Sequence, residues 1–231
     1  MTDFKQIYAT QAENYEQLVS REDYQSNILT TLKEIRPFSK QTIVEFGAGT
    51  GRLTTLLAPQ AKQIYAFDQA QAMLKVAQQK LASSPHTNWE LTIANNDKIP
   101  LPNNMADIAI EGWSFAHLRG WYPDSWQAKL DTTLNEMQRV LHPNGTIILL
   151  ETLGTGYTAP HRFPELAELY HHLEQVHQFK HSWIRTDYQF ASLAEADHLT
   201  RFFFGDELAD QVQTNNWIIL PECTGIWWKQ Q

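Results

Sequence analysis

The sequence predicts an α/β protein built on a doubly wound, mostly parallel sheet, and three observations predict it. Short apolar, β-branched runs alternate with amphipathic runs between residues 42 and 155. The first apolar run ends in three closely spaced glycines. The chain also lacks internal repeats, low-complexity segments and linkers rich in glycine, serine or proline. Such alternation produces a parallel sheet covered by helices on both faces, and the uninterrupted chain predicts a single domain over residues 1–231.

Length and composition fit one globular domain and disfavour several functional classes. The chain has 231 residues, of which 42% are hydrophobic, enough for a packed core. Its net charge of −8 disfavours a nucleic acid or an anionic membrane as the main partner, because both attract basic surfaces. Cys223 is the only cysteine, so no internal disulfide can form, which fits a reducing compartment. We therefore expect a cytoplasmic protein with neither a signal peptide nor a membrane span.

Hydrophobic periodicity assigns the elements of the first two thirds. Apolar residues three and four positions apart predict helices over the first 40 residues, with a stop before Pro37. Asp124, with Gln127 three residues later, is a candidate N-cap for a helix that reaches Leu141. The turn "HPNG" stops that helix. Strands are expected at residues 42–46, 63–68, 89–94, 106–112 and 146–153, and further helices from about residue 52 and over 70–81.

The last third has a different pattern. A helix is expected over 165–178, and alternating residues predict a strand over 182–190. Ser192 and Glu195 form a capping box for a helix that Gly205 ends. The final apolar stretch, 217–228, predicts one or two closing strands.

The stretch "TIVEFGAGTG" places Gly47, Gly49 and Gly51 directly after the first strand. In open α/β sheets, a glycine-rich turn that opens a helix forms a ligand-binding crevice, because glycine lets a ligand approach the backbone closely. The G-x-G-x-G spacing differs from the G-x-G-x-x-G of dinucleotide-binding proteins, and no Gly-Lys-Ser/Thr follows for a P-loop. Glu45 adds a carboxylate two residues before the first glycine.

Several motifs at consistent spacing resemble one enzyme family. "VEFGAGTGRLT" resembles motif I of the class I S-adenosylmethionine-dependent methyltransferases. "YAFDQAQAML", "ANNDKIPLPNNMADIAIEGWSFAHL" and "MQRVLHPNGTIILLET" resemble the family's later motifs, in order. The resemblance is good over residues 40–155, fair for the last two strands and weak for the N-terminal helices. It implies a Rossmann-like sheet of seven strands, with N-terminal helices and a helical insertion at 192–214 before the last strand.

The resemblance also implies S-adenosyl-L-methionine as the cofactor and assigns residues to it. Asp68, at the end of the second strand, would accept hydrogen bonds from the ribose hydroxyls, although it is also suited to cap the next helix. Where the family usually has an acid near the adenine, this chain has Asn95 and Asn96, whose amide oxygens could accept that hydrogen bond. The implied cofactor-binding residues are Glu45, Gly47, Ala48, Gly49, Gly51, Asp68, Gln69, Met73, Asn95, Asn96, Glu111 and Trp113.

The candidate catalytic residues follow the fourth strand, where the methyl group is expected. "EGWSFAHL" places Glu111 and His117 there, and histidine suits base chemistry near neutral pH. A structural hydrogen bond is the alternative role for His117. Residues 151–162, after the fifth strand, supply further candidates for substrate contact. These are Glu151, Tyr157, His161 and Arg162.

No metal site is expected from the sequence. His171, His172, His177 and His181 cluster, but their spacing matches no known ligand pattern. His171 and His172 are adjacent on a helix and point to different faces, so a solvated polar face is the favoured interpretation.

We expect methyl transfer to the oxygen or nitrogen of a small-molecule acceptor. The chain is divided into an N-terminal helical lid (1–40, with Tyr8 and Tyr15), a cofactor-binding core (41–155) and a substrate-side segment with the closing strands (156–231). Alternatives are a non-catalytic S-adenosylmethionine-binding regulator or partner subunit, and a protein or RNA methyltransferase. Either a monomer or a homodimer is compatible with the sequence.

Overall fold

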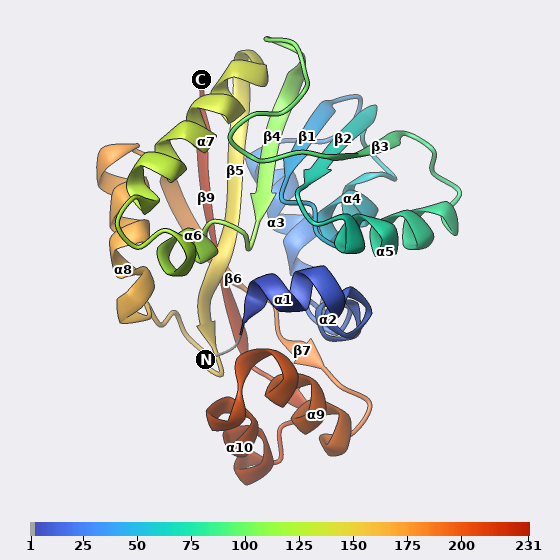
Figure 1. Cartoon of the computed structure of the whole chain (residues 1–231), viewed down its shortest axis with the longest axis vertical. Coiled ribbons are helices and arrows are strands. Elements are labelled where there is room, and N and C mark those ends of the chain that lie inside the picture. The colour runs from blue at the N-terminus through green and yellow to red at the C-terminus, as the bar shows by residue number, and fades with distance from the viewer. Residues whose placement is uncertain (1–2) are drawn as a thin grey trace.

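A seven-stranded sheet runs through the computed structural model, which describes residues 3–231 (Figure 1). The strand order is β3-β2-β1-β4-β5-β9-β6. β9 is antiparallel to both of its neighbours, and the other pairs are parallel. The strands of this sheet are β1 Thr42–Phe46, β2 Gln63–Asp68, β3 Trp89–Ile93, β4 Ala106–Gly112, β5 Leu141–Thr155, β6 Lys180–Arg185 and β9 Glu222–Gln230. The predicted Rossmann-like, mostly parallel seven-stranded sheet is confirmed.

Helices cover both faces of the sheet, as parallel strands require. One face packs against α3 Asn27–Ile35, α4 Arg52–Leu57 and α5 Gln71–Ala82. The other packs against α6 Ala116–Trp121, α7 Trp126–Val140, α8 Pro164–His171 and the π-helical turn η1 His172–Val176. Within β1, the side chain of Ile43 faces the first group, and Val44 and Phe46 face the second. This two-sided burial explains why the strands are almost uniformly apolar.

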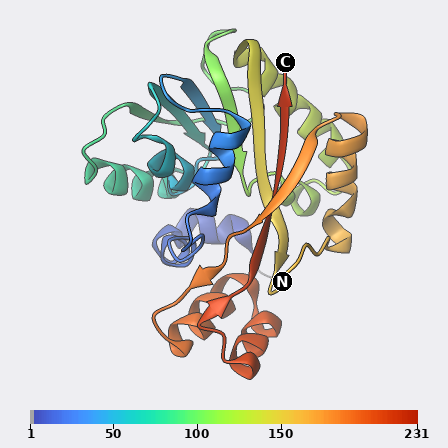
Figure 2. The ribbon, with the colours of Figure 1, turned by 180° about the vertical axis from the view of Figure 1, so that it is seen from behind.

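A smaller cluster joins the two ends of the chain. It brings α2 Ala12–Val19 together with α9 Leu193–Phe204 and α10 Asp206–Asn215 around Leu18, Leu199 and Val212. The short strands β7 Tyr188–Gln189 and β8 Ile219–Leu220 pair beside it. Both views show α1 Phe4–Thr10 and α2 between the sheet and the helices α9 and α10 (Figures 1 and 2). The expected N-terminal helices and the insertion before the last strand are present.

Some expected boundaries are wrong. The N-cap of α7 is Ser125 rather than Asp124, and no side chain caps that end. β5 begins at Leu141, and the turn "HPNG" is accommodated where the β4–β5 register shifts between Ala106 and Ile108. The predicted strand over 182–190 divides into β6 and β7. The capping box of α9 is confirmed on one side, since Ser192 Oγ accepts the amide of Glu195 at 3.1 Å.

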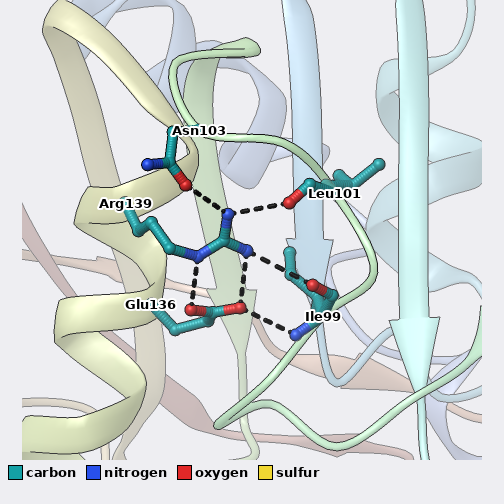
Figure 3. A network of polar contacts seen from close by, with 5 residues as sticks. All are labelled: Ile99, Leu101, Asn103, Glu136 and Arg139. Atoms are coloured by element: carbon teal, nitrogen blue, oxygen red, sulfur yellow. Dashed lines mark hydrogen bonds and ion pairs between the residues drawn. The ribbon is translucent and has the colours of Figure 1, made fainter.

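An arginine-centred network fixes the loop between β3 and β4 (Figure 3). The Arg139 guanidinium donates to the carbonyls of Leu101 and Ile99, to the Asn103 side chain and to the Glu136 carboxylate. Glu136 in turn accepts the amide of Ile99 at 2.8 Å. This loop is thereby held to α7, next to the segment that contains Asn95 and Asn96. Among the helices of residues 3–231, none has the length and apolar character to cross a membrane.

Candidate active site

A cavity of about 1100 Å³ lies at the carboxyl ends of β1, β2 and β4. Adjacent parallel strands end there, so the loops that follow them converge. Most of the residues implicated by the sequence border it. They are Gly47, Gly49, Asp68, Gln69, Met73, Asn95, Asn96, Trp113 and His117. The cavity therefore unites residues that are up to 70 positions apart in the chain.

The glycine turn keeps backbone exposed to this cavity. Gly47, Gly49 and Gly51 have φ angles of 66°, 54° and 74°, which side chains rarely tolerate. A Cβ atom at Gly47 would lie 2.7 Å from Ser114 Oγ, and one at Gly51 would lie 3.0 Å from Ala77 Cβ. At Gly49 the nearest atom would be Met73 Cε, at 3.5 Å. The first and third glycines permit close packing, whereas Gly49 leaves room on the cavity side.

Asp68 organises the same turn. Its Oδ2 atom accepts the amide of Gly49 at 2.8 Å, and its Oδ1 atom accepts the amide of Ala70 at 2.7 Å. Burial raises the pKa of the Asp68 carboxyl, and these two hydrogen bonds oppose that rise. A carboxylate has about four acceptor positions, so each oxygen can accept another donor from the cavity. The N-cap of α5 is Ala70 rather than Asp68, and no side chain caps that end, so the expected capping role is wrong. The contacts of Asp68 with the turn remain compatible with ligand binding.

Four of the implicated residues do not border the cavity: Glu45, Ala48, Gly51 and Glu111. Glu45 is 2% exposed, and its Oε2 atom accepts the Thr54 hydroxyl at 2.5 Å. Burial raises the pKa of Glu45 to about 8. Glu45 therefore lies behind the glycine turn, joined to α4.

The carboxyls of Glu111 and Glu151 accept hydrogen bonds from backbone amides at the start of α6. The amides of Phe115 and Ala116 donate to Glu151 Oε1 at 2.6 and 3.0 Å, and the Ser114 amide donates to Glu111 Oε1 at 2.5 Å. Burial raises the pKa of Glu111 to about 7, and burial together with the Glu111 charge raises that of Glu151 well above its usual range. These carboxyls fix the backbone immediately before His117.

His117 faces the N-terminal helices. Its Nε2 atom lies 2.7 Å from the Tyr8 hydroxyl, and its ring stacks on Trp121 at 4.8 Å between centroids. Phe4 packs against its other side at 4.9 Å. Burial lowers the pKa of His117 to about 4, so the imidazole is neutral at physiological pH. A neutral ring can accept a hydrogen bond from Tyr8 or donate one to it, depending on its tautomer.

The N-terminal helices form a cover over the cavity. Lys5, Tyr8, Ala9 and Tyr15 border it. Tyr8 and Tyr15 meet edge-to-face at 5.4 Å. Phe203 of α9 packs against Phe4 at 5.1 Å and against Tyr15 at 5.4 Å. The cover thus joins three helices from opposite ends of the chain.

Arg52 ties this cover to the glycine turn. Its guanidinium stacks on Trp113 at 3.9 Å and pairs with Glu22 at 2.7 Å. Trp113 itself has a φ of 57°, an unusual conformation for a bulky residue. The strained residue is thus held between the sheet and the helical cover.

Sequence reasoning missed part of the cavity wall. Ser114, Leu118, Trp121, Tyr122, Lys129 and Thr133 also border it. Ser114, Leu118, Trp121 and Tyr122 lie on or beside α6, close to the motif that was recognised, but Lys129 and Thr133 come from α7 and have no local signal. Among the other candidates, Tyr157 stacks on His161 at 4.0 Å. Arg162 pairs with Glu174 at 2.6 Å. None of these three side chains borders the cavity.

Comparison with known proteins decides the family. The family described as "Methyltransferase domain" matches residues 44–149, a segment that begins within β1, includes the glycine turn and ends within β5. Residues 44–149 therefore form a methyltransferase domain, and the surrounding fold is that of the class I S-adenosylmethionine-dependent methyltransferases. An uncharacterized methyltransferase of Geobacillus kaustophilus is 28% identical over 160 residues, which cover 65% of this chain and 67% of that protein.

Two further comparisons agree with this assignment. The demethylmenaquinone methyltransferase of Symbiobacterium thermophilum is 33% identical over 114 residues, covering 47% of this chain and 41% of that protein. A solved S-adenosylmethionine-dependent methyltransferase from Aquifex aeolicus has the same fold, with a TM-score of 0.55 and 16% identity over 97% of this chain and 92% of that one. These similarities support S-adenosylmethionine as the cofactor of the methyltransferase.

The cavity of the methyltransferase fits this cofactor. The open backbone at Gly49 admits a ligand to van der Waals distance. The Ser114 side chain lies beside Gly47 at the cavity wall, where its hydroxyl can bond to the Glu111 carboxylate or to a polar ligand group. Asp68 adds spare acceptor positions for hydroxyl donors.

Proposed function

We propose that this methyltransferase transfers a methyl group to a small-molecule acceptor that binds beneath the N-terminal helices, beside Tyr8 and His117. The observation that carries the proposal is the 2.7 Å contact between the Tyr8 hydroxyl and His117 Nε2. It joins the cover to α6, the helix that follows β4, at the cavity that Asp68 and the glycine turn also border. A polar pair in an otherwise aromatic wall suits the orientation of a nucleophile.

The roles of the cofactor-binding residues are part of this proposal. Asp68 accepts the ribose hydroxyls, and the turn from Gly47 to Gly51, which includes Ala48, receives the amino-acid end. Met73, Gln69, Asn95 and Asn96 border the adenosine side, and Trp113 borders the methyl site. Glu45 and Glu111 act as positioning residues, because their side chains lie behind the cavity wall.

S-adenosylmethionine supplies a methyl group on a positively charged sulfur, whose C–S bond breaks as the bond to the acceptor forms. The protein's task is mainly to hold the acceptor in line, which can contribute about 7–11 kcal/mol. Tyr8 presents an oxygen to the acceptor's N–H or O–H group while bonded to His117. The proton that the acceptor loses passes to water, because a ring whose pKa is about 4 holds a proton too weakly.

The nature of the acceptor follows from the weak basicity of this pair. Burial lowers the pKa of His117 to about 4, so the ring is a poor base for a hydroxyl that must lose its proton early. A neutral amine attacks through its lone pair and needs no such base. We therefore favour an amine nitrogen, with a hydroxyl oxygen as the second candidate.

The cover favours a small acceptor over a protein or an RNA. Tyr8 is only partly exposed, and Phe4, Tyr15 and Phe203 close the surrounding wall. A macromolecular chain would have to displace α1 to reach His117. In this proposal residues 1–40 are the lid, of which residues 1–2 lie outside the described residues; 41–155 bind the cofactor, and 156–231 complete the substrate side. A cytoplasmic location and a monomeric or homodimeric state remain part of the proposal.

Replacement of the pair tests the proposal. We expect Tyr8→Phe and His117→Ala each to lower the turnover of methyl transfer into the low-mass fraction of a cell extract by about tenfold, because each removes a hydrogen bond of about 1.4 kcal/mol that orients the acceptor. The double variant should lose little more, because the two groups act together. Binding of S-adenosylhomocysteine, measured by calorimetry, should be nearly unchanged.

Tyr24→Phe is the matched control, because Tyr24 is 40% exposed and lies outside the cavity. It should retain full turnover. Near-normal turnover in folded Tyr8→Phe and His117→Ala proteins would contradict the assignment of the acceptor site.

A further inference from the structure

Two histidines and an aspartate converge on the outer surface of α7, away from the active-site cavity. Asp131 Oδ1 lies 2.9 Å from His172 Nε2 and 2.7 Å from His177 Nε2. One potential ligand atom from each residue lies within 4.8 Å of the other two. None of the three residues borders the cavity assigned to the cofactor and acceptor.

The π-helical turn η1 brings the two histidines together. On a regular α-helix, residues five positions apart point about 140° away from each other, given 3.6 residues per turn. Here the amide of His177 donates to the carbonyl of His172 at 3.1 Å, which is the wider i→i+5 closure of a π-turn. The two rings consequently lie 5.0 Å apart and share one carboxylate oxygen. The spacing of the two histidines therefore matches no known ligand pattern of a regular helix, although their rings lie together in the structure.

We propose that Asp131, His172 and His177 form a binding site for a divalent late first-row metal, with Zn²⁺ as the best fit. Imidazole nitrogen and carboxylate oxygen are established zinc ligands, and three of them leave a fourth position for water. When the metal binds, each ring coordinates through Nε2 and carries its proton on Nδ1, so the hydrogen bonds to Asp131 are replaced by coordination.

The surroundings leave room for that fourth ligand. A surface cavity of about 740 Å³ adjoins His172 and is bordered by Trp126, Glu168 and His171. The side chains of His172 and His177 are 12% and 23% exposed, whereas that of Asp131 is 44% exposed. Trp126 packs edge-on against His172 at 5.5 Å and holds its ring. The net charge of −8 also favours cations near the surface.

A metal at this position would clamp α7 to the end of α8. Asp131 lies on α7, whereas both histidines lie on or beside η1, 41 and 46 positions later in the chain. Binding to the folded state alone would raise the melting temperature, by about 5–10 °C at a hundredfold excess over the dissociation constant. The clamp would stabilise α7, which supplies Lys129 and Thr133 to the cavity wall, without entering the reaction.

The test uses the full chain without an affinity tag, and Zn²⁺ and Co²⁺ as probes. Equilibrium dialysis with elemental analysis should find one Zn²⁺ per chain, and Co²⁺ should show the visible bands of a low-coordinate nitrogen- and oxygen-ligated site. Asp131→Asn, His172→Ala and His177→Ala should each weaken Zn²⁺ binding at least about tenfold. His198→Ala, an exposed histidine on α9, is the control and should bind normally.

The outcomes are separable from those of the proposed function. Binding of S-adenosylhomocysteine should persist in all three variants, because their side chains lie outside its cavity. Circular dichroism shows whether each variant folds, and the Co²⁺ spectrum of the unmodified chain decides the question even if one does not. No stoichiometric metal in the unmodified chain, or undiminished binding by folded His177→Ala, would overturn the proposal.

Discussion

His117 is neutral in the folded protein, because burial lowers its pKa to about 4. Protonation would leave the ring without an acceptor for the Tyr8 proton. We therefore expect turnover at saturating acceptor to be insensitive to this histidine between pH 6 and pH 8, and to fall as the pH drops towards 4. A pH–rate profile measures this. A fall centred near 6.5, the usual histidine value, would show that His117 is more hydrated than its packing indicates.

Asp68 combines a structural contact with a proposed contact to the cofactor. We expect Asp68→Ala to weaken S-adenosylhomocysteine binding by about 1.5–3 kcal/mol, the scale of hydrogen bonds to a charged group, as measured by calorimetry. Asp107→Ala is the matched control, because Asp107 Oδ2 accepts the Thr42 amide at 2.8 Å at the amino end of β1, whereas the cavity lies at its carboxyl end. An unchanged dissociation constant in folded Asp68→Ala protein would restrict Asp68 to its backbone contacts.

At the scale of the element, α6 is short, and its position depends on the carboxyls of Glu111 and Glu151, which accept the amides at its start. Glu151→Ala removes the acceptor of the Phe115 and Ala116 amides. It should lower the free energy of unfolding by about 1–3 kcal/mol, because the Ala116 amide becomes unsatisfied and the Phe115 amide keeps only its 3.3 Å contact with Glu111 Oε1. Turnover should fall as His117 shifts, with much less effect on cofactor binding.

Glu151→Gln is the informative companion variant. The amide keeps one acceptor oxygen and removes the charge repulsion from Glu111, so stability and turnover should largely recover. Chemical denaturation and kinetics measure both. If Glu151→Ala leaves turnover unchanged, α6 is held by its other contacts and Glu151 does not position His117.

The elements whose signals are local could be predicted from the sequence. β1, its glycine turn and Asp68 follow from periodicity and spacing, and the capping box at Ser192 follows from two residues three apart. The docking of Tyr8 on His117 spans 109 positions and leaves no pattern in either segment. The pairing of His172 with His177 depends on a π-turn, which no hydrophobic period indicates. The sequence analysis placed Glu45 and Glu111 among the cofactor-binding residues, whereas neither borders the cavity. The alternation of a strand assigns its two faces but does not show where a cavity ends.

At the scale of the whole molecule, buried carboxyls set how stability depends on pH. Burial raises the pKa of Glu45 to about 8, from a usual value near 4.5. Between these values the folded state binds more protons than the unfolded state, so the free energy of unfolding falls as the pH rises. Glu222 acts in the same direction, because burial raises its pKa to about 8 as well.

Glu45→Gln should therefore flatten this dependence between pH 6.5 and pH 8. The slope of the unfolding free energy should shrink by up to about 1.4 kcal/mol per pH unit, the value for one proton. Urea denaturation across this range measures it. Glu90→Gln, at an exposed position on β3, should leave the slope unchanged. An unaltered slope in Glu45→Gln would mean that Glu45 is ionised in the folded protein.

The destination of the methyl group tests the central claim most directly. The protein is incubated with methyl-labelled S-adenosylmethionine and a cell extract, and the products are separated by size into small molecules, RNA and protein. We predict label in the small-molecule fraction, strongly reduced when His117→Ala or Tyr8→Phe replaces the unmodified protein. Label that appears instead in protein or RNA, or no transfer by protein that binds the cofactor, would contradict a small-molecule methyltransferase with an enclosed acceptor site.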